Sequence, residues 1–171
     1  MINVIDNFLP LEIFNPIQST MMGNNFPWFY NSEPVYKHEK GYDPKAFQFF
    51  HSIFDEKKGK SRFFSLYEKV FPFLSVEKLV RLKGNLNART FFPRRGGYHF
   101  DYADITTAIL YINTCNGGTK FKGGKKIKSV ANRVTIFDSN LIHSNVSCTD
   151  EKVRVVLNFN YIQQRPIPNL S

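Results

Sequence analysis

Hydrophobic and polar residues follow one pattern up to about residue 75 and a different one after it. In the first part, apolar residues recur at near-helical spacing. The segment Leu9-Pro10-Leu11-Glu12 is typical of a helix start, because Pro is favoured in the first turn. We predict a helix from there that ends at Gly23-Asn24-Asn25. One face of it would carry Leu11, Phe14, Ile17 and Met21.

Two further helices are predicted before residue 76. One begins at Asp43-Pro44, with Asp as the N-cap and Pro at the first helical position. The other runs from Ser61 to Phe71 and ends near Pro72. The apolar face of the first of these would carry Phe47, Phe50, His51 and Phe54. Because His51 lies on that face, we interpret it as a packed histidine and not as a ligand.

From Val76 onward, short runs rich in Val, Ile, Thr, Tyr and Phe are separated by Gly and Asn clusters, which is typical of strands and turns. The predicted strands are Leu79–Thr90, Tyr98–Asp101, Thr106–Asn113, Thr119–Phe121, Lys126–Ser129, Arg133–Asp138 and Val153–Tyr161. Helices followed by many strands with no helix between them indicate the α+β class. Tight turns favour an antiparallel sandwich or a small barrel.

The chain length of 171 residues suits one domain, in which residues 1–75 form a mainly helical flank and residues 76–162 form the core. No apolar run approaches the ~20 residues of a membrane span, so no membrane association is expected. The N-terminus lacks the features of a signal peptide. The spacing of Cys115 and Cys148 indicates neither a disulfide framework nor a zinc site, and we expect no role for them. A cytoplasmic location follows, or the host cytoplasm if the chain is phage-encoded.

The net charge of +9 is unevenly distributed. Residues 1–55 carry three basic and six acidic side chains (−3), and the remainder carries 20 basic and eight acidic ones (+12). This asymmetry favours an anionic partner such as nucleic acid or a nucleotide. A solvated lysine-rich surface is the alternative explanation.

The candidate chemistry lies in the second part of the chain. His99 and Asp101 are two residues apart in a predicted strand, so their side chains point to the same side. His143 follows at the end of a later strand, and Arg154 comes eleven residues after it. Two histidines and one carboxylate on one face of a ferrous ion form the facial triad of non-haem iron oxygenases. A guanidinium is the natural bidentate partner of a carboxylate, which suits a chelating co-substrate acid.

This ordered set resembles the iron(II)/2-oxoglutarate-dependent dioxygenases of the prolyl 4-hydroxylase-like superfamily, especially its small phage-type members. The resemblance covers roughly residues 79–161. Four further segments resemble family motifs: Ala108-Ile109-Leu110-Tyr111-Ile112-Asn113, Gly117-Gly118-Thr119-Lys120-Phe121, Arg133-Val134-Thr135-Ile136-Phe137 and the N-terminal Val4-Ile5-Asp6-Asn7-Phe8-Leu9.

The resemblance implies a double-stranded β-helix, which is a jelly-roll barrel, flanked by N-terminal helices. It implies that His99, Asp101 and His143 hold iron(II), and that 2-oxoglutarate and O2 are co-substrates. The far carboxylate of 2-oxoglutarate would pair with Arg154 and Tyr111. Thr119 and Asn87 are further candidates for this contact.

The implied reaction is hydroxylation of a substrate C–H bond with release of succinate and CO2. The resemblance favours a peptidyl-prolyl substrate, whereas the basic charge supports nucleic acid or a nucleotide. A non-catalytic binding module on the same fold is a third alternative. The loop Phe91–Gly97 precedes two metal-ligand candidates, so we expect it at the pocket rim. Candidate substrate contacts are Arg94, Arg95, Asn160 and Asn113.

Overall fold

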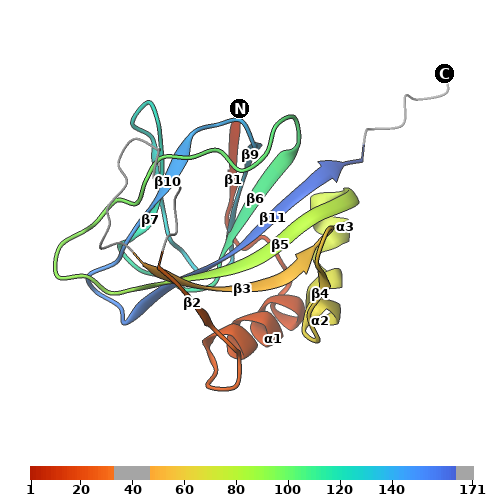
Figure 1. Cartoon of the computed structure of the whole chain (residues 1–171), viewed down its shortest axis with the longest axis horizontal. Coiled ribbons are helices and arrows are strands. Elements are labelled where there is room, and N and C mark those ends of the chain that lie inside the picture. Colours follow the sequence, from red (N-terminus) through yellow and green to blue (C-terminus); the bar gives the residue numbers. More distant parts are fainter. Residues whose placement is uncertain (33–46, 165–171) are drawn as a thin grey trace.

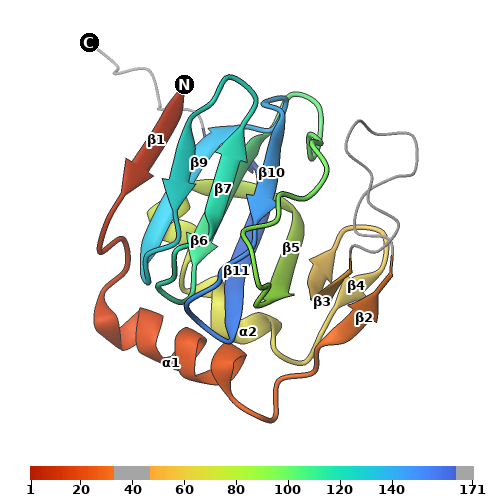
Figure 2. The same cartoon turned by 90° about the vertical axis from the view of Figure 1, so that its left-hand side faces the viewer.

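The computed structural model describes residues 1–32 and 47–164 of the chain. Two antiparallel sheets face each other and enclose a barrel (Figures 1 and 2). In spatial order, the large sheet contains β1 (Ile2–Ile5), β9 (Arg133–Asp138), β6 (Thr106–Tyr111), β11 (Val153–Gln163), β5 (Val76–Ala88), β3 (Gln48–Asp55) and β2 (Phe29–Asn31), with β4 (Gly59–Lys60) paired to β3. The small sheet contains β10 (His143–Val146), β7 (Gly118–Phe121) and β8 (Lys126–Lys128). Chain neighbours lie apart within these sheets, so the expected jelly roll and the α+β class are confirmed.

The central strand β6 is buried on both faces, which explains its unbroken apolar sequence. Ala108 and Leu110 pack in the core on the helix side, whereas Ile109 and Tyr111 pack in the core between the two sheets. Alternate residues of a strand point to opposite faces, so one apolar run supplies both cores. Strand β11 lies beside β6 and is buried in the same way.

The helices cover the face of the large sheet that is turned away from the small sheet (Figure 1). Helix α1 (Leu11–Met22) follows Pro10, as predicted, and buries Phe14, Ile17 and Met21. The third predicted helix is split into two short ones, α2 (Phe64–Glu68) and α3 (Phe71–Leu74). Within the described ranges, no helix is both long and apolar enough to cross a membrane.

The second predicted helix is wrong. Gln48–Asp55 form strand β3, which pairs with both β2 and β5, while Asp43-Pro44 lie outside the described residues. The described residues up to residue 75 therefore contribute four strands as well as helices, and this part of the flank is helical only in part. Over so short a run, the spacing of the apolar residues fits a helix as well as a strand. Pairing with β5 stabilises the strand. His51 is buried against Phe26, as a packed histidine should be.

The segment predicted as strand Tyr98–Asp101 is also not a regular strand. His99 forms only an isolated bridge, to His143, through two backbone hydrogen bonds. The amide of His99 donates to the carbonyl of His143 at 3.0 Å, and the reverse bond is 2.9 Å long. Strand β10, which begins at His143, was not predicted.

Candidate metal centre and adjoining cavity

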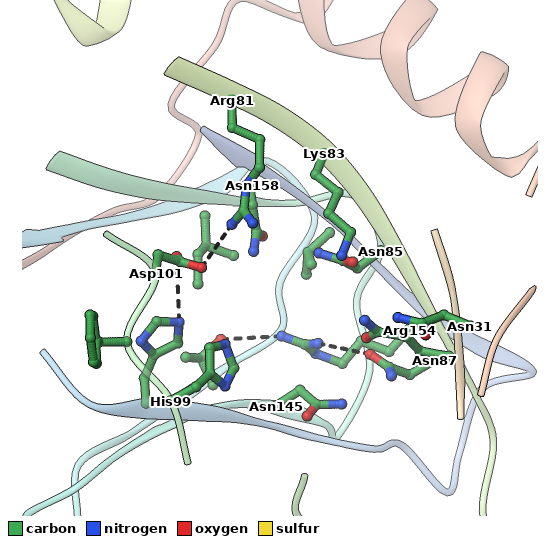
Figure 3. Close-up of a pocket in the computed structure, with 16 residues that line it drawn as sticks. Asn31, Arg81, Lys83, Asn85, Asn87, His99, Asp101, Asn145, Arg154 and Asn158 are labelled. Carbon is green, nitrogen blue, oxygen red and sulfur yellow. Dashed lines mark hydrogen bonds and ion pairs between the residues drawn. The ribbon is translucent and has the colours of Figure 1, made fainter. Parts of the chain in front are cut away.

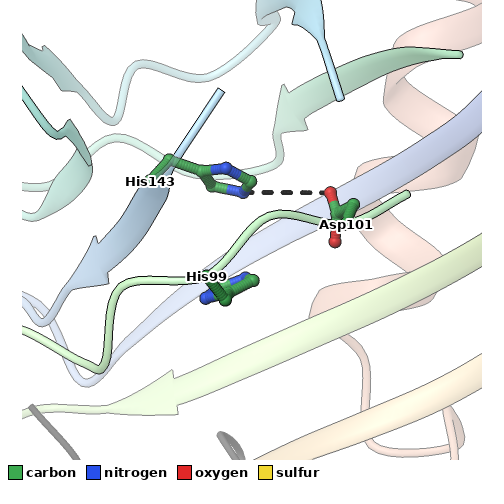
Figure 4. Close-up of side chains that lie close together, drawn as sticks. All are labelled: His99, Asp101 and His143. Atoms are coloured by element: carbon green, nitrogen blue, oxygen red, sulfur yellow. Dashed lines mark ion pairs between the residues drawn. The ribbon is translucent and has the colours of Figure 1, made fainter. Parts of the chain in front are cut away.

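The side chains of His99, Asp101 and His143 lie close together (Figure 4). One nitrogen or oxygen atom from each side chain lies within 4.8 Å of the corresponding atoms of the other two. The two backbone bonds between His99 and His143 hold these residues side by side, and the amide of Asp101 donates to the carbonyl of Ser139 at 3.3 Å. Side chains from two segments that are far apart in the sequence are thus held together by the backbone.

Both imidazole rings have a fixed orientation. Nδ1 of His99 lies 3.2 Å from the carbonyl oxygen of Gly97, and Nδ1 of His143 lies 2.8 Å from that of Leu141. Because a carbonyl oxygen only accepts, each Nδ1 donates to it, and Nε2 is the ring nitrogen left for another partner. Burial lowers the pKa of His143, so this ring is neutral near pH 7. A neutral imidazole with a free Nε2 is the form in which His143 can bind a metal ion.

The Asp101 carboxylate is held by three donors. Arg81 donates from Nη2 to Oδ1 at 2.8 Å, and Asn160 donates from Nδ2 to Oδ2 at 3.2 Å. The hydroxyl of Thr107 donates to Oδ2 at 3.3 Å. Burial pushes the pKa of Asp101 upward, but the charge of Arg81 and then the two histidines outweigh it, so the pKa lies below its usual value. The carboxylate is therefore ionised and oriented.

A cavity of about 320 Å³ adjoins these three side chains (Figure 3). Its lining comprises Asn31, Gln48, Arg81, Lys83, Asn85, Asn87, His99, Phe100, Asp101, Ile109, Thr119, His143, Asn145, Arg154, Val156 and Asn158. Only Phe100, Ile109 and Val156 among them are apolar. Binding cavities for small molecules are usually lined mainly by apolar side chains, so this cavity is unusually polar.

Arg154 enters the cavity from β11 and is 2% exposed. Its guanidinium donates from Nη2 to Thr119 Oγ1 at 3.2 Å and from Nη1 to Asn87 Oδ1 at 3.5 Å. Its Nε has no partner, and no ion pair to it forms within residues 1–32 and 47–164. Burial lowers the pKa of Arg154. A buried cation without a counter-ion is costly, which suits a ligand that brings a negative charge.

No family model matches this sequence, and no curated protein matches it. Solved structures do match, at low sequence identity. A 2OG-Fe(II) oxygenase family oxidoreductase from Burkholderia pseudomallei has a TM-score of 0.70 and 8% identity, over 96% of this chain and 86% of that one. A Trichoplax adhaerens prolyl hydroxylase, in complex with a hypoxia inducible factor peptide, has a TM-score of 0.60 and 12% identity, over 94% of this chain and 83% of that one. HygX from Streptomyces hygroscopicus, with nickel and 2-oxoglutarate bound, has a TM-score of 0.56 and 11% identity, over 95% of this chain and 83% of that one.

The chain has the fold of the 2OG-Fe(II) oxygenases. These neighbours match nearly the whole chain, including the helices and strands before residue 76. The resemblance drawn from the motifs and the likeness of the fold therefore agree.

Two other co-substrate candidates of this oxygenase fold lie beside Arg154. Thr119 and Asn87 line the cavity and accept hydrogen bonds from the guanidinium. Tyr111 is fully buried, and its hydroxyl donates to Thr119 Oγ1 at 2.9 Å. Tyr111 is not among the residues that line the cavity, so it orients Thr119.

The four substrate candidates lie elsewhere than expected, since none of them lines the cavity. Both amide atoms of Asn113 bond to the backbone of β11, so this side chain holds strands together. Asn160 is buried beneath Asp101 and accepts from Arg81 Nε at 2.9 Å. Arg94 and Arg95 are exposed, and the guanidinium of Arg95 stacks on Tyr98.

Several residues that line the cavity were not among the candidates from the sequence, and two of them are the cations Arg81 and Lys83. The signal for them was the alternation of polar side chains at positions 81, 83, 85 and 87. In a strand such alternation places all four on one face. This face of β5 forms one wall of the cavity.

Cys115 and Cys148, for which no role was expected, come together in the fold. Their sulfur atoms and a carboxylate oxygen of Asp150 all lie within 4.8 Å of one another. Burial, together with the neighbouring Cys115, raises the pKa of Cys148 to about 11. At neutral pH, and without a metal ion, Cys148 is therefore a thiol and not a thiolate.

Proposed function

We propose that this chain is an Fe(II)- and 2-oxoglutarate-dependent dioxygenase. The reaction consumes a substrate C–H bond, O2 and 2-oxoglutarate, and yields the C–OH product, succinate and CO2. The observation that carries the proposal is a single cavity with two matched ends. One end holds the His99, Asp101 and His143 cluster, and the other holds the cation of Arg154, which has no ion-pair partner in residues 1–32 and 47–164.

The residues of the cluster fit a first-row divalent metal ion. They offer two imidazole nitrogens and one ionised carboxylate, which is the donor set of the facial triad. His99, Asp101 and His143 would hold the ion. When bound, iron(II) supplies the activation of dioxygen. The solved neighbour HygX, with nickel and 2-oxoglutarate bound, supports both the metal and the co-substrate.

Arg154 fits the far carboxylate of 2-oxoglutarate. Its guanidinium can form two parallel hydrogen bonds to a carboxylate, and its charge lacks a partner in the described ranges. Thr119 and Asn87 hold this guanidinium in place, and Tyr111 in turn holds Thr119. These residues bind and orient the co-substrate.

Arg81 and Asn160 act on the metal end in the same way. They hold the Asp101 carboxylate in one orientation, so that it is available without a rearrangement of the side chain. Thr107 adds a third donor and is itself hydrogen-bonded to Ser139. Such support keeps the ligand in place when the site is loaded.

The fold neighbours support more than one substrate. One is a prolyl hydroxylase in complex with a peptide, which supports the peptidyl-prolyl substrate that the sequence resemblance favours. Another structure of HygX contains hygromycin B as well as 2-oxoglutarate, so this fold is also found with a small-molecule ligand. Since one fold binds many substrates, the residues that line the cavity determine which substrate this chain accepts.

The proposal is tested by succinate formation without any substrate. The full chain with Fe(II), ascorbate and 2-oxoglutarate should form succinate slowly, and omission of Fe(II) should abolish it. His143→Ala should abolish it too, whereas Lys78→Met, an exposed change on β5, should not. A binding module on the same fold would form no succinate in any of these assays, and that result would refute the proposal.

A further inference from the structure

Lys83 lies on the cavity-facing side of β5, between Arg81 and Asn85 (Figure 3). Its partner across the strand pair is Asn158 of β11, which also lines the cavity. Two residues along a strand span about 7 Å, so Lys83 lies one pleat from Arg81, which holds Asp101. Lys83 is thus near the metal end of the cavity. Arg154 pairs with Asn87, about 13 Å further along β5 at the backbone.

The ammonium group of Lys83 has no counter-ion in the described part of the chain. Nζ lies 4.9 Å from the ring centroid of Phe50, and no hydrogen bond or ion pair to it is formed there. Asp101 is the carboxylate whose charge acts on Lys83, but it already forms an ion pair with Arg81 at 2.8 Å. Burial and then the charge of Arg81 lower the pKa of Lys83 to about 8, so it is still mostly charged at pH 7. A cation–π contact with Phe offsets only part of such a cost.

Two amide groups beside Lys83 are also unsatisfied. Oδ1 of Asn85 and Oδ1 of Asn158 are buried, and neither has a hydrogen-bond partner in the described structure. Both residues line the cavity. Buried carbonyl oxygens seek donors, and a ligand with hydroxyl or amino groups supplies them. An apolar proline ring would leave both oxygens and the Lys83 charge without partners.

We propose that the substrate carries an anionic group, a carboxylate or a phosphate, which binds Lys83, and hydroxyl or amino donors, which bind Asn85 and Asn158. This inference rests on the proposed function, because it names the substrate class of the same cavity. Arg154 binds the carboxylate of the co-substrate, so Lys83 remains to bind the anionic group of the substrate. The position of Lys83 near the metal ligands places the hydroxylated carbon within a few bonds of the anionic group.

The test compares pairs of probes in which one member carries an anionic group and the other does not. The full chain is loaded with Mn(II) and N-oxalylglycine, a 2-oxoglutarate analogue that occupies the Arg154 end. Isothermal titration then measures two pairs: N-acetylproline against N-acetylprolinamide, and glycerol 3-phosphate against glycerol. The first pair tests a carboxylate and the second a phosphate. Lys83→Met removes the charge, Lys83→Arg keeps it, and Lys78→Met removes an exposed charge from the same strand.

At least one charged probe should bind tenfold or more tightly than its neutral partner. Lys83→Met should abolish this preference, and Lys83→Arg and Lys78→Met should retain it. The pair that shows the preference distinguishes a carboxylate substrate from a phosphate one. Equal binding of both members of each pair, or a preference that survives in Lys83→Met, would overturn the inference, and tighter binding of N-acetylprolinamide would favour a neutral prolyl substrate instead. Failure of Mn(II) and N-oxalylglycine to bind the wild-type chain would instead refute the proposed function.

Discussion

At the scale of single residues, the cavity contains two cations for which the described part of the chain supplies no anion. Arg154 and Lys83 come from adjacent strands, and neither forms an ion pair within the described ranges. Arg81, from the same face of β5, is matched by Asp101. Two unmatched cations in one cavity indicate that two acidic groups enter it.

The first prediction concerns Arg154. Arg154→Lys should raise the dissociation constant of N-oxalylglycine from the Mn(II)-loaded chain at least tenfold, about 1.4 kcal/mol, because an ammonium cannot copy the two-pronged guanidinium. The affinity for Mn(II) itself, measured by calorimetry, should change less than twofold. An unchanged affinity for N-oxalylglycine would show that another cation holds the co-substrate.

The second prediction concerns the stability cost of Lys83. Its pKa falls from 10.5 to about 8 on folding, so below pH 8 both states are protonated and the folded state bears the cost of holding this half-buried charge. Between pH 8 and 10.5 the folded state loses the proton first, and the free energy of unfolding rises. Lys83→Met should therefore stabilise the metal-free chain by about 2 kcal/mol at pH 7. Urea unfolding at pH 7 and pH 10 measures this.

The stabilisation by Lys83→Met should shrink as the pH rises from 8 to 10.5. Lys78→Met is the control, because Lys78 is exposed and pairs with Glu56 on the surface. Its effect should stay below about 1 kcal/mol and should not follow the titration of Lys83. If Lys83→Met destabilised the chain at pH 7, the charge of Lys83 would have to be satisfied within the protein.

At the scale of elements, the small sheet presents His143 and Thr119 to the cavity from adjacent strands. His143 begins β10, which pairs with β7, and Thr119 lies on β7. The close packing of β7 on β8 depends on Gly118, where a Cβ atom would lie 2.2 Å from the carbonyl oxygen of Ile127. The backbone of β8 would have to move to admit any side chain there.

The third prediction follows from this contact. Gly118→Ala should lower the free energy of unfolding by about 1–3 kcal/mol, because a methyl group forced against backbone is overpacked. Chemical denaturation measures the change. Lys128→Ala, at the position paired with Gly118 but with an exposed side chain, should leave stability within about 0.5 kcal/mol. Equal stability of Gly118→Ala and wild type would mean that β7 and β8 separate at little cost.

At the scale of the whole molecule, the candidate metal ligands come from segments that are distant in sequence. His99 and Asp101 lie between β5 and β6, and His143 lies at the start of β10. A ligand that binds the folded chain alone stabilises it by mass action. The stability of the whole barrel should therefore depend on the loading of the site.

The fourth prediction is the size of that dependence. Mn(II) and N-oxalylglycine at about a hundred times their dissociation constants should each stabilise the chain by about 2.7 kcal/mol. For a domain of this size, each such gain raises the midpoint of thermal unfolding by about 5–10 °C. His143→Ala should abolish the response to both ligands. A midpoint that does not respond to Mn(II) in the wild-type chain would contradict the metal site.

The sequence alone determined the helix at α1, most strands after residue 76, and His99 and Asp101 as paired ligand candidates. Each of these depends on short-range information: periodicity for the elements, and the i, i+2 relation for His99 and Asp101. The jelly roll and the partner histidine came from resemblance to a family. The spacing by itself did not place His143 beside His99; two backbone hydrogen bonds do.

Only the tertiary structure decided that Gln48–Asp55 form strand β3 and where Asn113 and Asn160 lie. It also decided that Arg81 and Lys83 both line the cavity. The apolar residues of β3 suit a helix as well as a strand, and pairing with β5, about thirty residues away, settles which forms. Asn113 and Asn160 are polar in sequence like any surface amide, yet their atoms are fully used inside the fold. Whether a charge is matched depends on which strand lies opposite it, and strand order is a long-range property of the chain. This is why the cations that define the cavity became apparent only in the folded structure.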